Sequence, residues 1–298
     1  MYPSSRPEPS ANRHLPIFEQ QRSRLMGIAY RMLGSREQAQ DVLQDAWLRW
    51  SATPLESVDT AQAWLTSTVT RLCVDSLRAT RSERQAYSGP WLPAPWLEPD
   101  SAPAADARAE LASDLSIALL VLLESLTPDE RAAFLLHDVF DSDYAEVASV
   151  LGKTQAACRQ LVHRARSHVR QRKTRFAVTP EASRALIQRF VEGMRTQDHA
   201  ALLALFSQDA LWTADGGGKA PAASKSLHGP RALSRLAAAV WRLYLQFRRF
   251  EEVDVNGAPG LVLRDAQGAA LSVMGFETDG VHIHAVYSQL NPDKLRNL

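Results

Sequence analysis

The stretch YSGPWLPAPWLEPDSAPAADA, residues 87–107, constrains the fold of this 298-residue chain more than any other segment. It contains five prolines, and proline removes a backbone donor and blocks a continuing helix, so the stretch predicts an extended linker. Its large apolar side chains are unusual for a free linker, and we expect them to dock on a folded surface: Trp91, Leu92, Trp96 and Leu97. The chain therefore divides into folded parts on either side of residues 87–107.

Both flanks of the linker have helical patterns. Residues 14–86 repeat apolar side chains at three- and four-residue spacing, for example in FEQQRSRLMGIAYRML. Gly34 should end that helix, and Ser35 with Gln38 three positions later should cap the next one. Residues 108–175 are helical again, with TPDE at 127–130 and DYAE at 143–146 as helix starts.

The C-terminal part, residues 181–298, has a different pattern. Helical stretches such as HAALLALF come first, and strand-like runs follow, separated by Asn256-Gly257, Gln267-Gly268 and Asp279-Gly280 turns. Helices followed by an antiparallel meander indicate an α+β domain. The predicted fold class is therefore multidomain, with two all-α domains and one α+β domain.

Composition excludes several other classes. The longest apolar run, IALLVLL at 117–123, is much shorter than the ~20 residues that span a bilayer, and the N-terminus lacks the apolar core of a signal peptide. We therefore expect a cytoplasmic protein without a membrane partner. Cys73 and Cys158 are far apart and form no CxxC pair, so we expect no metal site, and no cofactor is implied.

A basic segment stands out in a chain whose net charge is only +1. Residues 154–175 hold seven arginines and lysines and no acid. They follow a short helical pattern and Gly152, which suits a turn, while Cys158 and Leu161 should pack inward on Val147 and Leu151. This spacing is that of a helix-turn-helix, whose second helix enters the DNA major groove.

The second helix should present its polar side chains to DNA. Arginine and glutamine suit guanine and adenine edges, so we predict base and groove contacts by Gln155, Arg159, Gln160, His163, Arg164 and Arg166. The tail should contact phosphates through Arg170, Arg172, Lys173 and Arg175.

The N-terminal helices point to one class of DNA-binding protein. YRMLGSREQAQDVLQDAWLRW, residues 30–50, resembles region 2 of bacterial sigma factors, and residues 63–84 resemble the part that opens the −10 element. The resemblance implies binding to the β′ clamp of core RNA polymerase through one helix face: Asp41, Gln44, Asp45 and Leu48. It implies −10 DNA contacts by Arg71, Arg78 and Arg81, although many family members have asparagine at the position of Arg71.

With regions 2 and 4 and no region 3, the chain resembles an extracytoplasmic-function sigma factor with a fused SnoaL-like domain, a cone-shaped α+β fold. The resemblance implies that the helix-turn-helix is region 4 and reads the −35 element. Three motifs support that subgroup: WLPAP at 91–95, DGGGK at 215–219 and NPDKL at 291–295. The first of these usually has glutamate at the position of Ala94. By resemblance the motifs regulate contacts between domains, through Trp91, Leu92, Pro93, Asp215, Gly216, Gly217, Gly218, Asn291, Pro292 and Asp293.

The DGGGK motif is not a phosphate-binding loop, because Ala220 follows Lys219 where serine or threonine is required. A tight turn in which the backbone passes close to another surface is the better interpretation. We predict a sigma factor that binds core polymerase, including its β flap, and promoter DNA, with no catalytic residues and no separate anti-sigma factor.

Two alternatives stay open. A cyclase-type enzyme or ligand sensor attached to a DNA-binding module would use Asp215, His282 and His284 as its polar groups. A helix-turn-helix repressor would bind duplex DNA without polymerase, and it leaves the 41–48 face unexplained.

Overall fold

The computed structural model describes residues 11–97, 116–172, 178–242, 249–296 and 298. The chain forms two compact units. The first, here the helical unit, lies within Met1–Arg81 and Ser125–Gln171. The second, here the sheet unit, lies within Ser82–Glu124 and Arg172–Leu298. The prediction of a helix from residue 108 and the phosphate contacts of Lys173 and Arg175 fall outside the described residues.

The first half of the helical unit contains α1 (Ala11–Leu33), α2 (Arg36–Ser51), a 3-10 turn (Leu55–Ser57) and α3 (Ala61–Ala79). The predicted boundary is confirmed: Gly34 has a φ of 67°, and the Ser35 side chain accepts a hydrogen bond from the Gln38 backbone. Trp50 is fully buried and its ring lies 5.3 Å from that of Trp64. These aromatic rings pack α2 against α3.

The second half of this unit contains α7 (Pro128–Phe134), a π-helical turn (Leu135–Val139), α8 (Tyr144–Leu151) and α9 (Gln155–Arg172). Both predicted capping boxes are present, at the starts of α7 and α8. Gly152 ends α8 with a φ of 61°, which glycine adopts without strain. Cys158 and Leu161 pack in one core with Val147, so the predicted helix-turn-helix packing is confirmed.

The two halves of the helical unit pack on one another. Helix α3 contacts α7 and α8, and α1 contacts α7. Arg131 of α7 is buried and donates a hydrogen bond to the Met32 carbonyl of α1 at 2.5 Å. This bond uses one of the last carbonyls of α1, which the helix itself leaves without a partner.

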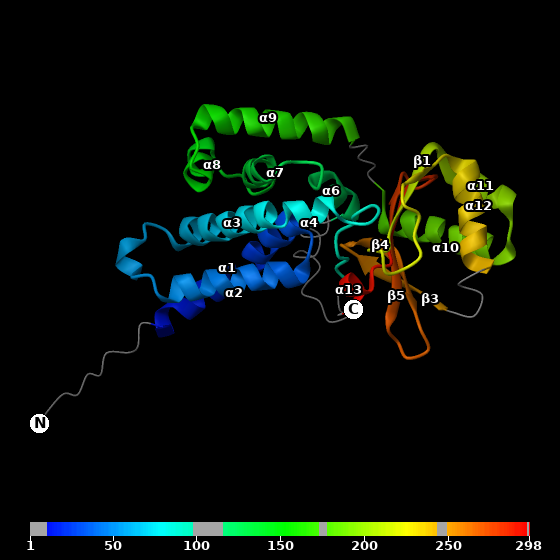
Figure 1. The fold of residues 1–298 in the computed structure, drawn as a ribbon, viewed down its shortest axis with the longest axis horizontal. Helices are drawn as coiled ribbons and strands as arrows, with labels where there is room; N and C mark the ends of the chain where they lie inside the picture. The colour runs from blue at the N-terminus through cyan, green and yellow to red at the C-terminus, as the bar shows by residue number, and fades with distance from the viewer. Residues whose placement is uncertain (1–10, 98–115, 173–177, 243–248, 297) are drawn as a thin grey trace, which may run out of the picture. The chain divides into compact units, whose positions relative to one another are not determined.

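The sheet unit begins with α4 (Arg81–Gln85) and α6 (Ile117–Leu123) and continues with α10 (Pro180–Thr196) and α11 (His199–Leu205). The strands are β1 (Phe206–Asp215), β2 (Leu227–His228), β3 (Arg249–Val255), β4 (Ala258–Arg264), β5 (Ala270–Thr278) and β6 (Ile283–Gln289). Helix α12 (Pro230–Val240) lies between β2 and β3 in sequence, and α13 (Pro292–Leu295) follows β6 (Figure 1). The sheet has the order β2-β1-β6-β5-β4-β3.

The sheet contains more than the predicted antiparallel meander. Strands β3 to β6 form the expected meander, but β1 pairs with β6 in parallel. Strand β1 starts at Phe206, directly after α11, inside the stretch that was expected to be helical. Buried residues do not alternate along β1, because other elements of the fold cover both faces of the sheet there.

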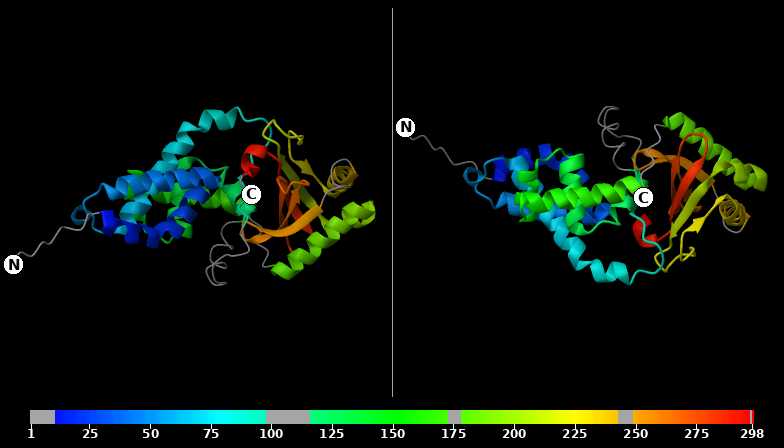
Figure 2. Two further views of the ribbon diagram at one scale, coloured as in Figure 1. Left: turned by 90° about the horizontal axis from the view of Figure 1, so that it is seen from below. Right: turned by 90° about the horizontal axis from the view of Figure 1, so that it is seen from above.

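Each face of the sheet has its own cover. Helices α10, α11 and α12 cover one face of the sheet (Figure 2). They enclose an apolar core that contains Phe190, Trp212 and Phe276. On the opposite face α6 and the linker form a second core, in which Leu92 and Ile117 pack with Ala285 and Tyr287. Leu92 is fully buried, so the apolar linker docks on a folded surface as its composition predicted.

The linker extends this contact beyond Leu92. Leu97 forms an antiparallel bridge with Val255, and the Asn256 backbone donates to the Trp96 carbonyl at 2.8 Å.

Across the described residues, no helix is both long enough and apolar enough to cross a membrane.

Candidate functional site

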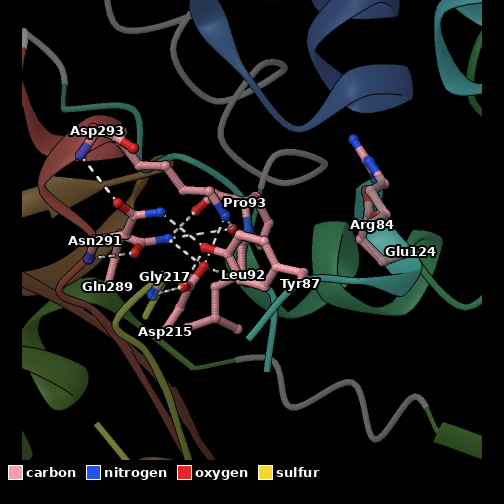
Figure 3. Close-up of polar contacts among 11 residues, drawn as sticks. Arg84, Tyr87, Leu92, Pro93, Glu124, Asp215, Gly217, Gln289, Asn291 and Asp293 are labelled. Carbon is pink, nitrogen blue, oxygen red and sulfur yellow. Dashed lines mark hydrogen bonds and ion pairs between the residues drawn. The ribbon is translucent and has the colours of Figure 1, made fainter. Parts of the chain in front are cut away.

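Asp215, the last residue of β1, is the centre of a buried polar cluster (Figure 3). Its Oδ1 accepts hydrogen bonds from the Tyr87 hydroxyl at 2.6 Å and the Gly217 backbone at 3.0 Å. Its Oδ2 accepts from the Leu92 backbone at 2.9 Å, from Gln289 at 3.2 Å and from Lys294 at 2.7 Å. Here the Asp215 node means Tyr87, Leu92, Asp215, Gln289, Asn291 and Lys294.

The node joins all three sequence motifs. Asn291 donates its side-chain amide to the Tyr87 hydroxyl at 2.8 Å. Gln289 donates to the carbonyls of Leu92 and Pro93, each at 3.2 Å, and Lys294 donates to the Leu92 carbonyl at 2.6 Å. The linker is therefore held by backbone groups as well as by side chains, and the donors come from the C-terminal segment.

The glycine loop closes one side of the node. Gly217 has a φ of 60°, and a Cβ placed there would lie 2.3 Å from the Asn291 amide nitrogen. Gly218 has a φ of 71°, and its Cβ would lie 3.2 Å from that of Ser88 in the linker. Gly216 is equally restricted, because its Cβ would meet the Ala220 carbonyl oxygen. The loop needs glycines because it passes close to the linker and to the C-terminal motif.

Pro292 and Asp293 of the C-terminal motif lie nearer the surface. Pro292 begins α13, and the exposed Asp293 forms an ion pair with Lys219 of the glycine loop. This contact ties the second motif to the third.

Cations lie against an aromatic ring beside the node. The Trp91 ring lies 4.3 Å from the Arg84 guanidinium and 3.9 Å from the Lys294 ammonium, which are cation–π distances. Arg84 also forms an ion pair with Glu124, the residue that caps α6. This pair, with its stacked Trp91, links α4 directly to α6.

Burial changes the acid–base properties of the node. Desolvation lowers the pKa of Lys294 to about 8, although the Asp215 carboxylate partly offsets this. Burial, together with the hydrogen bond to Asp215, raises the pKa of the Tyr87 hydroxyl. Asp215 already accepts hydrogen bonds from five donors, so its carboxylate is not free to act as a general acid or base.

Sequence reasoning missed several members of this cluster. Lys294 and Gln289 lie within or beside the NPDKL motif, and Tyr87 is the first linker residue. The position of Lys294 inside the NPDKL motif was the available signal for that residue. No local pattern signals the Arg84–Glu124 pair, because its members are 40 positions apart.

The predicted polymerase-binding residues form an open surface on α2. Asp41, Gln44, Asp45 and Leu48 are all exposed, and Leu48 is 59% exposed. Within the described part of the chain, none of the three polar side chains has a hydrogen bond or ion pair. An exposed leucine among free polar groups is typical of a protein interface.

The predicted −35 residues of α9 fall into two groups. Gln155, Arg159, Gln160 and His163 are exposed, and Arg159 donates to Gln155 and lies over the Tyr144 ring. Arg164 instead bonds to Glu130 at 2.7 Å, and Arg166 makes two bonds to Asp138 at 2.7 and 2.8 Å. The first group has no carboxylate partner among the described residues, whereas the second is bound to acids of its own domain.

The Arg164 contact also affects an acid. Burial by itself would raise the pKa of Glu130, but hydrogen bonds from Arg164 and Thr127 hold it below its usual value. This residue closes the capping box of α7, so Arg164 contributes to the start of that helix.

The predicted −10 residues of α3 and α4 are also divided. Arg71 donates to the carbonyls of Ser149 and Val150 at 2.7 and 2.8 Å, near the end of α8. Arg78 pairs with Asp129 of α7 at 2.7 Å, and Arg81 is exposed. Two of the three side chains are therefore occupied by the second half of the helical unit.

His282 lies in the turn before β6 and His284 lies on β6, so the two histidines do not form a pair on one strand. His284 lies 3.0 Å from Asp279, a carboxylate that also accepts from the His282 backbone at 2.6 Å. Burial would raise the pKa of Asp279, but these hydrogen bonds keep it well below its usual value. The carboxylate thus orders the turn before β6.

Comparison with known proteins defines the class. The family model for sigma-70 region 2 matches residues 17–83, and that for sigma-70 region 4 matches residues 116–169. The two matches correspond to α1–α3 with the start of α4, and to α6–α9. The helical domains are therefore those of a bacterial sigma factor.

Curated relatives specify the family. The extracytoplasmic-function (ECF) RNA polymerase sigma factor SigJ of Mycobacterium tuberculosis is 38% identical over 228 residues, 76% of this chain and 73% of the relative. The probable ECF sigma factor SigI of the same species is 32% identical over 199 residues, 64% of this chain and 67% of the relative. The solved structure of M. tuberculosis SigJ covers 95% of this chain and 98% of its own, with 33% identity and a TM-score of 0.77. This chain belongs to the ECF sigma factor family, and an α+β domain follows its sigma regions.

Proposed function

We propose that the exposed face of α2 binds the β′ clamp of core RNA polymerase and that α9 reads the −35 element. The α2 assignment is supported by free polar groups around an exposed Leu48, which suit an interface between proteins. The α9 assignment is supported by exposed arginine and glutamine side chains on a helix-turn-helix. Region 4 would also contact the β flap, and Arg71, Arg78 and Arg81 would serve the −10 strand once they are free.

In this proposal, the sigma factor without core polymerase cannot bind the −10 and −35 elements of a promoter at the same time. The −10 and −35 elements are centred about 25 base pairs apart, which is roughly 85 Å at about 3.4 Å per base pair. Arg71 of region 2, however, is bonded directly to the last turn of α8, just before the recognition helix. One molecule in this arrangement cannot read both elements, so core polymerase has to separate regions 2 and 4.

The SnoaL-like domain regulates this opening in cis, in place of a separate anti-sigma factor. The observation that carries this part is the Asp215 node, where the linker between regions 2 and 4 is bonded to the C-terminal domain. Because linker and domain belong to one chain, their effective concentration is on the order of millimolar, and modest contacts suffice. The protein would act in the cytoplasm, where its polymerase is.

The test is run-off transcription with purified core polymerase, on a promoter selected from genomic DNA with the reconstituted holoenzyme. The full chain is compared with Asp215→Asn, which keeps the shape of the side chain and removes its charge. A promoter-specific transcript establishes the sigma-factor roles, and a changed transcript level with Asp215→Asn supports regulation by the node. Equal transcription by both proteins would contradict cis regulation through Asp215.

A ligand-binding or enzymatic role of the C-terminal domain is the weaker candidate. Its predicted acid, Asp215, is occupied by the linker, and His284 is paired with Asp279. Promoter-specific transcription without any added small molecule would argue against a required ligand.

A further inference from the structure

We propose that when the sigma factor opens, α6 stays on the sheet of the C-terminal domain, while the linker leaves the Asp215 node and releases region 2. The C-terminal domain would then move together with region 4. This inference rests on the proposed sigma-factor function, and it adds which of two contacts with the C-terminal domain opens. The linker joint is the contact of the linker with the Asp215 node, and the α6 joint is the contact of α6 with the sheet.

The α6 joint is apolar. Ile117 is buried against Gly275 of β5, where a Cβ would lie 2.7 Å from the Ile117 Cγ2. Because glycine has no side chain, Ile117 can pack directly on the strand backbone. Ala118 and Val121 extend the same helix face into the cluster with Ala285 and Tyr287. Separating α6 from the sheet would expose all of these apolar groups to water at once.

The linker joint is mainly polar. Leu92 is its buried apolar anchor next to the node and Leu97 packs against Val255 further along, but the backbone at Leu92 is held by hydrogen bonds to Asp215, Gln289 and Lys294. Water can replace such bonds, so each contributes little net free energy. The ammonium of Lys294 is also costly to keep buried, as its lowered pKa indicates. The linker is therefore the weaker of the two joints.

The chain connections assign each joint to one sigma region. Only Thr80 separates α3 of region 2 from α4, whose Arg84 stacks on Trp91 of the linker. Residues 124–127 alone separate α6 from α7 of region 4, and the region 4 family model itself starts at residue 116. The linker joint thus holds region 2, and the α6 joint holds region 4.

Two engineered disulfides test the proposal in the full chain. For Ile117→Cys with Gly275→Cys, the two Cβ positions are 3.5 Å apart, within the range of about 3.5–4.5 Å that a disulfide requires. For Ser88→Cys with Gly218→Cys the distance is 3.2 Å, and the exposed Ser88 can adjust. The native Cys73 and Cys158 are buried, and burial raises the pKa of both thiols, so they should not interfere.

Run-off transcription is measured for each variant, oxidised and then reduced, with the four single variants as controls. We expect the oxidised Ser88–Gly218 lock to lose transcription at least about tenfold and to recover it with dithiothreitol. The oxidised Ile117–Gly275 lock should transcribe like its reduced form. An active Ser88–Gly218 lock, or an Ile117–Gly275 lock that is silent until reduced, would overturn the proposal. Silence of the wild-type chain would instead overturn the sigma-factor function on which it rests.

A variant without new cysteines gives an independent reading. Tyr87→Phe removes only the hydroxyl that bonds Asp215 and Asn291, so the linker should leave more easily. We expect more transcript at limiting core polymerase. The matched control is Tyr287→Phe on β6. The Tyr287 hydroxyl bonds Glu277, which lies outside the node. An unchanged or lower transcript level with Tyr87→Phe would contradict a linker that has to leave.

Discussion

The exposed face of α2 and the Asp215 node use the same kinds of side chain in opposite ways. The α2 face carries Asp41, Gln44 and Asp45, and the node carries Asp215, Gln289 and Asn291. The α2 side chains are exposed and unbonded among the described residues, whereas those of the node are buried and bonded to one another or to the linker. Carboxylates and amides therefore do not by themselves indicate an external partner.

The energetic consequence differs between the two places. A solvated carboxylate on α2 keeps its hydrogen-bonding capacity for a second macromolecule and contributes little to folding. A buried carboxylate has lost its water and depends on every donor around it. Substitutions on α2 should thus affect binding and not stability, and substitutions in the node should affect stability and linker docking.

The largest expected effect is that of Asp215→Ala. It leaves the Lys294 ammonium and the Leu92 backbone amide buried without their acceptor, which should cost about 3–5 kcal/mol of unfolding free energy. Urea unfolding followed by tryptophan fluorescence measures this loss. Asp45→Ala is the matched control, with an expected change within about 0.5 kcal/mol. Equal losses for the two variants would remove the contrast between the two regions.

Leu48→Asp should have the opposite profile. The side chain is exposed, so stability should hold, but the affinity for core polymerase should fall by about tenfold or more because a central apolar contact is lost. Fluorescence titration of labelled factor with core enzyme measures the affinity. Leu203→Asp, an exposed leucine of α11, is the control. A Leu48 variant that binds as tightly as wild type would move the interface away from α2.

The two groups of arginines on α9 offer a finer contrast. Arg159→Ala should weaken −35 binding by about 1–3 kcal/mol, because this exposed guanidinium contacts only Gln155 and the Tyr144 ring among the described residues and can turn toward a base edge. Arg166→Ala should change binding less, because that side chain is bonded to Asp138. Holoenzyme binding to promoter duplexes at one stated salt concentration separates them. A larger effect at Arg166 would mean that its ion pair breaks on DNA.

The smallest effect concerns pH. The folded pKa of Lys294, about 8, is below its usual 10.5, so the unfolded chain binds more protons between these values. Unfolding free energy should therefore rise with pH in this window, on the order of 1 kcal/mol from pH 8 to about 9.5. Urea unfolding at these pH values, compared with Lys294→Met, measures it. Wild type and Lys294→Met with the same slope would show that another group titrates.

The pKa of Tyr87 sets the upper limit of that experiment. Its folded pKa is raised, so it contributes stability that is present below the usual tyrosine pKa of about 10 and is lost at higher pH. Measurements are therefore kept below pH 10, where Lys294 is the node residue that titrates.

Much of the fold followed from local sequence rules. Gly34 with Ser35, the capping boxes at Thr127 and Asp143, and the left-handed Gly152 are short-range features, and the structure has each of them. Strand β1 was missed because its parallel pairing with β6 joins residues more than seventy positions apart, and no local pattern encodes such a pairing.

The sequence by itself determined the helix starts, the helix-turn-helix and the motifs that mark the linker, because caps, turns and amphipathic periods act over a few residues. Only the tertiary structure decided that Tyr87, Asp215 and Lys294 meet, and that Arg71 bonds the end of α8. The order of the charged residues is fixed along the chain, but the protonation and hydrogen bonding of each group depend on which neighbours exclude water from it. That neighbourhood exists only once distant segments have packed.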